Sequence, residues 1–192
     1  MNYIDTFEEK YAPHLADRTE TFREMFLYLD SLSKDFYTIV ETGTTRNPGN
    51  FLGDGCSTIM FDEYINTKRD GLLYTVDISL ESCNVASSIT SDKTIVTLGD
   101  SIEFLSNFEF PEQIDLLYLD SYDFDFNNPH VSSLHHIKEL TAIYARLQSG
   151  TMIVVDDNFR DGTGKGAYVR SFLDNVGDTL IMDSYQLVYR KR

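Results

Sequence analysis

The sequence predicts an α/β fold with a single doubly wound sheet, mostly parallel, and helices on both faces. Two patterns predict it. Short apolar runs alternate with helical stretches, the arrangement that builds parallel sheets. The chain then ends in two strands joined too closely for a crossover, which requires an antiparallel hairpin. The 192 residues, 42% of them hydrophobic and 24% charged, are enough for one core and typical of a folded domain.

The N-terminal part of the chain predicts helices. Apolar residues recur every three or four positions in residues 17–32, which indicates an amphipathic helix with Asp17 or Thr19 as its N-cap. Residues 3–15 predict a shorter helix, broken near Pro13. We expect residues 1–35 to form a helical segment packed on the main domain.

The main domain, residues 36–192, contains the predicted sheet. Buried parallel strands appear as short apolar runs rich in β-branched residues. Five such runs occur, at 36–41, 72–77, 94–98, 114–120 and 152–156. Predicted helices lie between them, near 57–65, 80–89, 101–108 and 132–147. A last helix at 167–175 precedes the hairpin strands 179–182 and 185–190, whose predicted turn is Asp183-Ser184.

Charge and composition exclude several classes of protein. Sixteen Lys and Arg against thirty-one Asp and Glu give a net charge of −15, which opposes binding to nucleic acid phosphates. No apolar run approaches the ~20 residues that span a bilayer, and no signal peptide is visible, so we expect a cytoplasmic protein without a membrane partner. Cys56 and Cys83 form no CxxC motif, which indicates neither a disulfide scaffold nor a zinc site.

Carboxylates follow all five predicted parallel strands. They are Glu41, Asp77, Asp100, Asp120 and the pair Asp156-Asp157. Ligands of open parallel sheets bind outside the carboxyl ends of the strands, so these side chains mark a candidate site. Gly43 follows the first strand and would let a ligand approach bare backbone. The motifs GxGxxG and GxxxxGK[ST] are absent, which favours a ligand that needs no phosphate cradle.

Two of these carboxylates have a functional and a structural interpretation. Asp77 ends the second strand, where a carboxylate of a doubly wound fold can bind ribose hydroxyls, or it caps the helix that begins near Leu80. Asp100 could accept a hydrogen bond from an adenine, or it caps the helix that begins at Ser101. Only their combination with the other strand ends is informative.

The segments that follow the predicted strands, taken in chain order, resemble those of the class I S-adenosylmethionine-dependent methyltransferases. The resemblance lies in Glu41-Thr42-Gly43-Thr44, Asp77, Gly99-Asp100-Ser101 and the closing hairpin, and it covers residue 37 to the C-terminus. It implies the strand order 3-2-1-4-5-7-6. It also implies cofactor binding by Glu41, Gly43, Thr44, Asp77, Asp100, Ser101 and Asp120, with the methionine part at the first turn, the ribose at Asp77 and the adenine at the third loop. The cationic sulfonium and ammonium suit these carboxylates.

The first loop departs from the family pattern. Instead of further glycines, Thr44-Thr45-Arg46 opens a longer loop that runs to Ser57-Thr58. The cofactor carboxylate could be held by Arg46 or by the start of the helix at Ser57 and Thr58. We favour the helix start.

The ends of the fourth and fifth strands predict a metal site. Adjacent parallel strands lie ~4.8 Å apart, so Asp120 and the run Asp156-Asp157-Asn158 could share Mg²⁺, which prefers oxygen ligands. The alternative is that Asp156 and Asp157 cap a turn. These segments resemble the Mg²⁺-dependent O-methyltransferases of the catechol and macrocin types, which implies Asp120 and Asp157 as ligands with Asp156 or Asn158 third. Such a metal would bind and acidify a substrate hydroxyl.

The general base is left open. The catechol enzymes carry a lysine three residues after the first Asp, where this sequence has Asp123. Asp123 could act as base, and so could His130, or one of His135 and His136, of which at most one should face the site. We select Asp123 and His136.

Lys165 lies in the glycine-rich segment after the fifth strand. It is the third predicted catalytic residue, because it could meet an anionic substrate group from a mobile lid. Alternatively, this glycine-rich stretch merely separates the strand from the next helix.

Together these observations predict an S-adenosylmethionine-dependent methyltransferase that is assisted by Mg²⁺ and acts on a hydroxyl of a small molecule or sugar. Tyr122, Phe124, Phe126 and Phe159 could form a wall for a ring-bearing acceptor, or pack in the core. A metal-dependent hydrolase or lyase on this scaffold, and a non-catalytic S-adenosylmethionine-binding protein, are the alternatives. A homodimer is left open.

Overall fold

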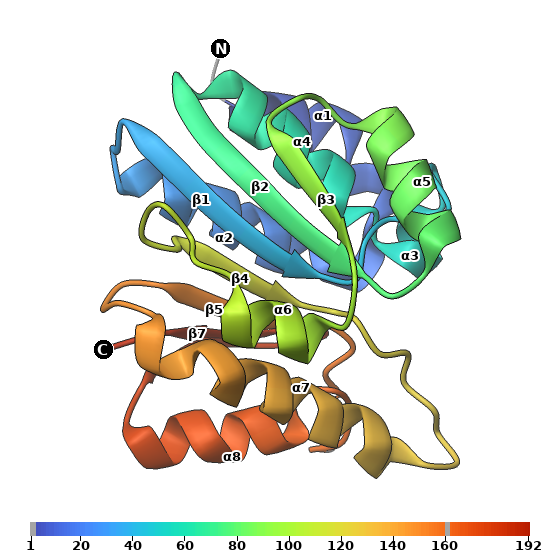
Figure 1. Cartoon of the computed structure of the whole chain (residues 1–192), viewed down its shortest axis with the longest axis vertical. Helices are drawn as coiled ribbons and strands as arrows, with labels where there is room; N and C mark the ends of the chain where they lie inside the picture. The colour runs from blue at the N-terminus through green and yellow to red at the C-terminus, as the bar shows by residue number, and fades with distance from the viewer. Residues whose placement is uncertain (1–2, 160–161) are drawn as a thin grey trace.

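The computed structural model describes residues 3–159 and 162–192, and it confirms the predicted fold class (Figure 1). Within these residues, one sheet has the order β3-β2-β1-β4-β5-β7-β6. Its strands are β1 (Phe36–Thr42), β2 (Asp70–Asp77), β3 (Thr94–Leu98), β4 (Leu116–Leu119), β5 (Met152–Val155), β6 (Thr179–Asp183) and β7 (Leu187–Arg190). The pairs among β1 to β5 are parallel, whereas β7 runs antiparallel to both β5 and β6.

Helices cover both faces of the sheet (Figure 1). One face carries α1 (Tyr3–Lys10), α2 (Thr19–Ser31) and α4 (Ser57–Thr67), and the other carries α6 (Ser101–Asn107), α7 (Pro129–Ile143) and α8 (Ala167–Val176). The short α3 (Phe51–Asp54) precedes α4, and α5 (Leu80–Ile89) connects β2 to β3. In the described part of the chain, no helix combines the length and apolarity that crossing a membrane requires.

The N-terminal helices contribute to the core of the sheet. Phe22 of α2 stacks on Tyr118 of β4 with ring centroids 5.8 Å apart, and Phe26 meets Phe61 of α4 edge-on at 6.1 Å. Each of these rings is fully buried, and a ring of this size buries 150–250 Å². The segment before the first strand is therefore packed into the same hydrophobic cluster as the sheet.

Several predicted boundaries are wrong; for example, the helix predicted near 132–147 is α7, which spans Pro129–Ile143. We predicted Asp17 or Thr19 as the N-cap of α2, but the N-cap is Arg18, whose guanidinium has no acceptor for the helix N–H groups and donates to Asp156. The predicted two-residue turn Asp183-Ser184 is longer, since Asp183 ends β6 and β7 begins only at Leu187.

Candidate functional site

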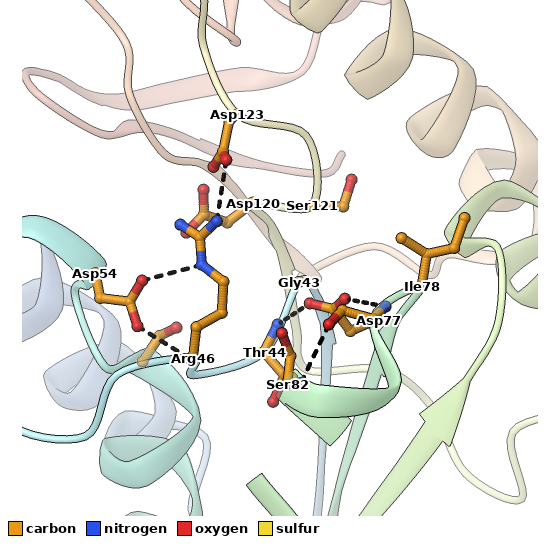
Figure 2. A pocket seen from close by; sticks show the side chains of 12 residues that line it. Gly43, Thr44, Arg46, Asp54, Asp77, Ile78, Ser82, Asp120, Ser121 and Asp123 are labelled. Atoms are coloured by element: carbon orange, nitrogen blue, oxygen red, sulfur yellow. Dashed lines mark hydrogen bonds and ion pairs between the residues drawn. The ribbon is translucent and has the colours of Figure 1, made fainter. Parts of the chain in front are cut away.

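The carboxyl ends of β1, β2 and β4 surround a cavity of about 320 Å³ (Figure 2). Its lining includes Gly43, Thr44, Ser57, Asp77, Asp120 and Asp123. A second cavity of about 280 Å³ shares Asp77, Ile78 and Ser121 with the first and adds Asp100, Ser101 and Tyr122. The two cavities are therefore neighbours, and most of the predicted cofactor-binding residues line one or the other.

Gly43 allows β1 and β4 to approach closely at the cavity. Its φ is +78°, and a Cβ built on it would lie 2.5 Å from the carbonyl oxygen of Asp120, which is closer than real Cβ atoms come. Its backbone N–H donates to the carbonyl of Val76 at 2.9 Å. Only glycine suits this position without movement of the Asp120 backbone.

Glu41 lies behind the cavity and not in its lining. Its carboxylate is fully buried and accepts hydrogen bonds from Ser57 Oγ at 2.6 Å, Thr58 Oγ1 at 2.7 Å and Thr75 Oγ1 at 2.7 Å. Burial raises the pKa of Glu41 to about 7, although the three hydroxyl groups oppose this shift. Thr58 Oγ1 in turn accepts from the Thr45 N–H at 2.9 Å. Glu41 thus ties the end of β1 to the start of α4.

Asp77 joins the loops that follow β1 and β2. One of its oxygens accepts from the Ser79 N–H at 2.7 Å and the other from the Thr44 N–H at 3.2 Å. The N-cap of α5 is Ser79, whose hydroxyl accepts from the Ser82 N–H. The capping interpretation of Asp77 is therefore wrong, and its carboxylate lines both cavities.

Asp100 does cap a helix. It is the N-cap of α6 and accepts from the Glu103 N–H at 2.9 Å. Ser101 is buried, and its Oγ lies 3.1 Å from Nε2 of His135. Both residues line the second cavity, where binding of an adenine stays a prediction.

Arg46 extends across the first cavity (Figure 2). Its Nε lies 3.1 Å from Asp54 and its Nη1 lies 3.0 Å from Asp123. By contrast, the hydroxyls of Ser57 and Thr58 are directed to Glu41. Arg46 therefore presents a cationic side chain to the cavity, while the two hydroxyls that we favoured are already engaged.

Asp120, Asp156 and Asp157 come together as predicted. Each offers one oxygen, and the three oxygens lie within 4.8 Å of one another. The chain leaves the strand at Asp157, whose φ of +45° turns its carboxylate toward the other two. This bend brings consecutive residues to one point, although strand residues would alternate between faces.

Two buried cations already contact these carboxylates. Lys165 Nζ forms ion pairs with Asp120 and, at 3.0 Å, with Asp157. Arg18 Nε lies 3.1 and 3.0 Å from the two oxygens of Asp156. Tyr185 donates to Asp157 at 2.6 Å.

The donors suit Mg²⁺ in kind, but the ion does not fit among them as they are arranged. The Lys165 ammonium lies between Asp120 and Asp157, where the cation was predicted. Asn158 is turned away, since its amide donates to Asp183 at 3.1 Å and to the Ser184 carbonyl at 2.9 Å.

The predicted catalytic residues have very different surroundings. The side chain of Asp123 is 74% exposed and pairs with Arg46 at the cavity. His136 is fully buried, hydrogen-bonds the Ser132 carbonyl at 2.8 Å, and lines neither cavity; burial lowers its pKa to about 4. Lys165 is 1% exposed, so the structure contradicts its placement on a mobile lid.

Sequence reasoning missed Arg18 and Tyr185. Arg18 lies 138 residues before its partner Asp156, in a helical segment with no motif of its own. Its guanidinium also lies over the Tyr185 ring, 4.6 Å from the centroid. No local pattern relates these residues, so only the three-dimensional arrangement identifies them.

The fold, with its sheet order β3-β2-β1-β4-β5-β7-β6, is similar to that of several solved methyltransferases. A "putative O-methyltransferase" from Klebsiella pneumoniae aligns over 100% of this chain and 91% of its own, with a TM-score of 0.60 and 19% identity. The O-methyltransferase NovP aligns over 95% of this chain and 78% of its own, with a TM-score of 0.60 and 14% identity.

MycE, from the mycinamycin biosynthetic pathway, has the same fold and was solved in complex with Mg, S-adenosylhomocysteine and mycinamycin VI. It aligns over 91% of this chain with a TM-score of 0.60 and 15% identity, and this chain spans about half of its length, 49%. No protein-family model and no curated protein matches the sequence. At these identities the likeness establishes the fold alone.

Proposed function

We propose that the protein is an S-adenosylmethionine-dependent O-methyltransferase that acts on a hydroxyl of a small molecule or sugar. The observation that carries this proposal is the joint lining of one cavity by Gly43, Asp77 and Asp120, at the ends of three adjacent strands of a methyltransferase fold. NovP is an O-methyltransferase with this fold, which favours oxygen as the acceptor atom.

In this proposal the methionine part, the ribose and the adenine of the cofactor occupy different places in the two cavities. The methionine part lies at Gly43 and Thr44, where the cationic cofactor meets a lining rich in carboxylates. Its carboxylate pairs with Arg46, which exchanges one of its acidic partners for the ligand. The ribose hydroxyls donate to Asp77, and the adenine enters the second cavity between Ile78 and Tyr122.

Methyl transfer then requires little beyond alignment. The acceptor oxygen attacks the methyl carbon, the O–C bond forms, and the S–C bond breaks with its electron pair passing to sulfur, which leaves S-adenosylhomocysteine. The hydroxyl proton passes to a carboxylate at the rim, either Asp120 or Asp123, both of which line the cavity. Holding the two reactants in line supplies most of the acceleration.

Lys165 is unsuited to be the base. Burial alone would lower the pKa of its ammonium, but the charges of Asp120, Asp157 and Asp156 outweigh this effect and raise it, so the lysine keeps its proton. The convergence of the three carboxylates and the Mg in the MycE structure point toward magnesium, but Lys165 Nζ already forms ion pairs with Asp120 and Asp157. Because Lys165 lies between the predicted ligands, no step above uses the metal.

An aromatic cluster favours an acceptor with a ring. Phe159 lies 4.9 Å from Phe124, 5.6 Å from Phe126 and 6.1 Å from Tyr185 between ring centroids. Phe126 is 80% exposed, so the cluster offers a free apolar surface next to Asp157, the hydrogen-bond partner of Tyr185. Tyr122, the fourth predicted wall residue, instead lies 5.3 Å from His135.

Calorimetry with S-adenosylmethionine and S-adenosylhomocysteine tests the proposal. Both should bind with one site per chain, and Asp77→Ala should weaken binding by at least ~10-fold because a buried charge-assisted hydrogen bond contributes about 1.5–3 kcal/mol. Asp92→Ala, at an exposed carboxylate, is the matched control and should bind as the wild type does. Absence of binding by the wild-type chain would refute the proposal and favour a hydrolase or lyase. Binding without transfer to any hydroxyl acceptor would favour a non-catalytic binding protein.

A further inference from the structure

Lys165 is held in place by the fold and not by its charge alone. Its backbone N–H donates to the Asp157 carbonyl at 3.0 Å, and the Ser133 hydroxyl donates to the Gly164 carbonyl at 2.6 Å. A Cβ at Gly164, where φ is +100°, would lie 2.3 Å from the Asp157 carbonyl oxygen. A Cβ at Gly166 would lie 2.9 Å from Asn158 Oδ1. Glycines on both sides therefore let the loop return close enough to β5 to place the lysine at Asp120 and Asp157.

The charges at this point are nearly balanced without a metal. The carboxyl groups of Asp120, Asp156 and Asp157 lie within ion-pair distance of two buried cations, Lys165 and Arg18. A divalent cation at Asp120 and Asp157 would have to displace the Lys165 ammonium, whose side chain is only 2% exposed. Moving a buried charge away from its partners is strongly unfavourable. The structure thus opposes metal binding both by occupancy and by charge.

We propose that Lys165 is the resident cation of this site, and that it takes the place of a divalent metal at Asp120 and Asp157. The inference rests on the proposed function for its catalytic meaning: methyl transfer by this protein would need no divalent ion. Lys165 then acts as a positioning residue that fixes the Asp120 carboxylate at the wall of the cofactor cavity. A single ammonium also orients that carboxylate with less charge than Mg²⁺ would bring.

Metal binding tests this inference independently of any acceptor. Mn²⁺ serves as a paramagnetic probe for Mg²⁺, and its binding is measured by electron paramagnetic resonance on the wild type, Asp120→Asn, Lys165→Met and Lys165→Met/Asp120→Asn. We expect the wild type to bind Mn²⁺ no better than Asp120→Asn does. Lys165→Met, which frees the carboxylates, should bind at least ~10-fold more tightly, and the added Asp120→Asn change should abolish this gain. Lys138→Met, at an exposed lysine of α7, is the control and should behave as the wild type.

Two results would overturn the inference. One is stoichiometric Mn²⁺ binding by the wild type that Asp120→Asn removes, because the metal would then displace Lys165. The other is a folded Lys165→Met variant with no gain in Mn²⁺ affinity. If Lys165→Met does not fold, the comparison of the wild type with Asp120→Asn still decides the matter.

Thermal unfolding adds a second readout, since a ligand that binds only the native state raises its melting temperature. MgCl₂ should raise the melting temperature of Lys165→Met and leave that temperature unchanged in the wild type. A higher melting temperature in the wild type alone would count against the inference. S-adenosylhomocysteine binding by the same samples separates this question from the proposed function. Loss of cofactor binding would undermine the methyltransferase proposal without changing the metal result.

Discussion

Gly43 packs directly on the backbone of Asp120, so closely that the smallest side chain would place its Cβ 2.5 Å from the Asp120 carbonyl oxygen. This contact joins the turn after β1 to the end of β4. It therefore couples the predicted binding place of the methionine part to a carboxylate of the cavity lining.

Gly43→Ala should destabilise the protein and weaken S-adenosylhomocysteine binding by at least ~10-fold. The left-handed backbone conformation costs an alanine roughly 1–2 kcal/mol, and the clash with Asp120 adds about 1–3 kcal/mol. Gly49→Ala is the matched control, because Gly49 also has a positive φ of +92° but nothing within 4 Å of its Cβ position. Urea unfolding and calorimetry should show only the smaller stability loss for Gly49→Ala, with unchanged binding. Equal effects of the two substitutions would show that the contact with Asp120 is unimportant.

Glu41 should make stability fall with rising pH. Its pKa is raised on folding from 4.5 to about 7 by burial, so the folded state binds the proton more tightly than the unfolded state does. This contribution is complete below pH 4.5 and is lost as the pH rises to about 7, with a total of roughly 3 kcal/mol. Urea unfolding between pH 4.5 and 8 should therefore show a shallower fall for Glu41→Gln than for the wild type. Glu9→Gln, at an exposed position, should keep the wild-type slope.

Arg18→Met should destabilise the protein by about 3–5 kcal/mol, because it leaves the buried Asp156 carboxylate without its guanidinium partner. Adding Asp156→Asn should restore part of this loss, since the uncompensated charge is removed. Arg23→Met breaks the more exposed pair with Glu8 and should cost no more than about 1 kcal/mol. Denaturation midpoints that rank Arg23→Met as the more damaging change would contradict this assignment.

Arg46→Met should weaken binding of S-adenosylhomocysteine by at least ~10-fold and leave adenosine binding unchanged, because adenosine lacks the carboxylate that Arg46 is proposed to hold. Calorimetry with both ligands measures the difference. Arg69→Met, at an exposed arginine, is the control. If Arg46→Met binds both ligands as the wild type does, the backbone at the start of α4 holds the carboxylate, as we first favoured.

The sequence predicts the sheet well because buried parallel strands leave local signals. The apolar runs at β1 to β5 and the short hairpin connection are visible without any tertiary information. The strand order came from the family resemblance and is confirmed. The boundary errors at the start of α2 and in the hairpin turn fall at Arg18 and at Gln186, which lies between β6 and β7; both side chains donate to the distant Asp156 carboxylate.

The site divides in the same way. Gly43, Asp77 and Asp120 follow strands directly, so their meeting at one cavity follows from the parallel sheet. The cations that pair with these carboxylates do not follow from the parallel sheet. Lys165 reaches Asp120 across 45 residues, and the sequence alone placed it on a mobile lid. The environment that sets the charge state of a carboxylate is long-range, whereas its position at a strand end is local.

The Arg18–Asp156 pair has a consequence for how the protein is made. A ribosome releases Arg18 long before Asp156, which follows it by 138 residues, and Gln186, which donates to the same carboxylate, emerges later still. Contacts between such distant positions form slowly because a long loop must close first. Phe26 of α2 can pack on Phe61 once α4 has been synthesised, whereas the Arg18 guanidinium stays without its carboxylate partner until Asp156 emerges. We expect nascent chains that stop before β7 to be the forms that need chaperone protection.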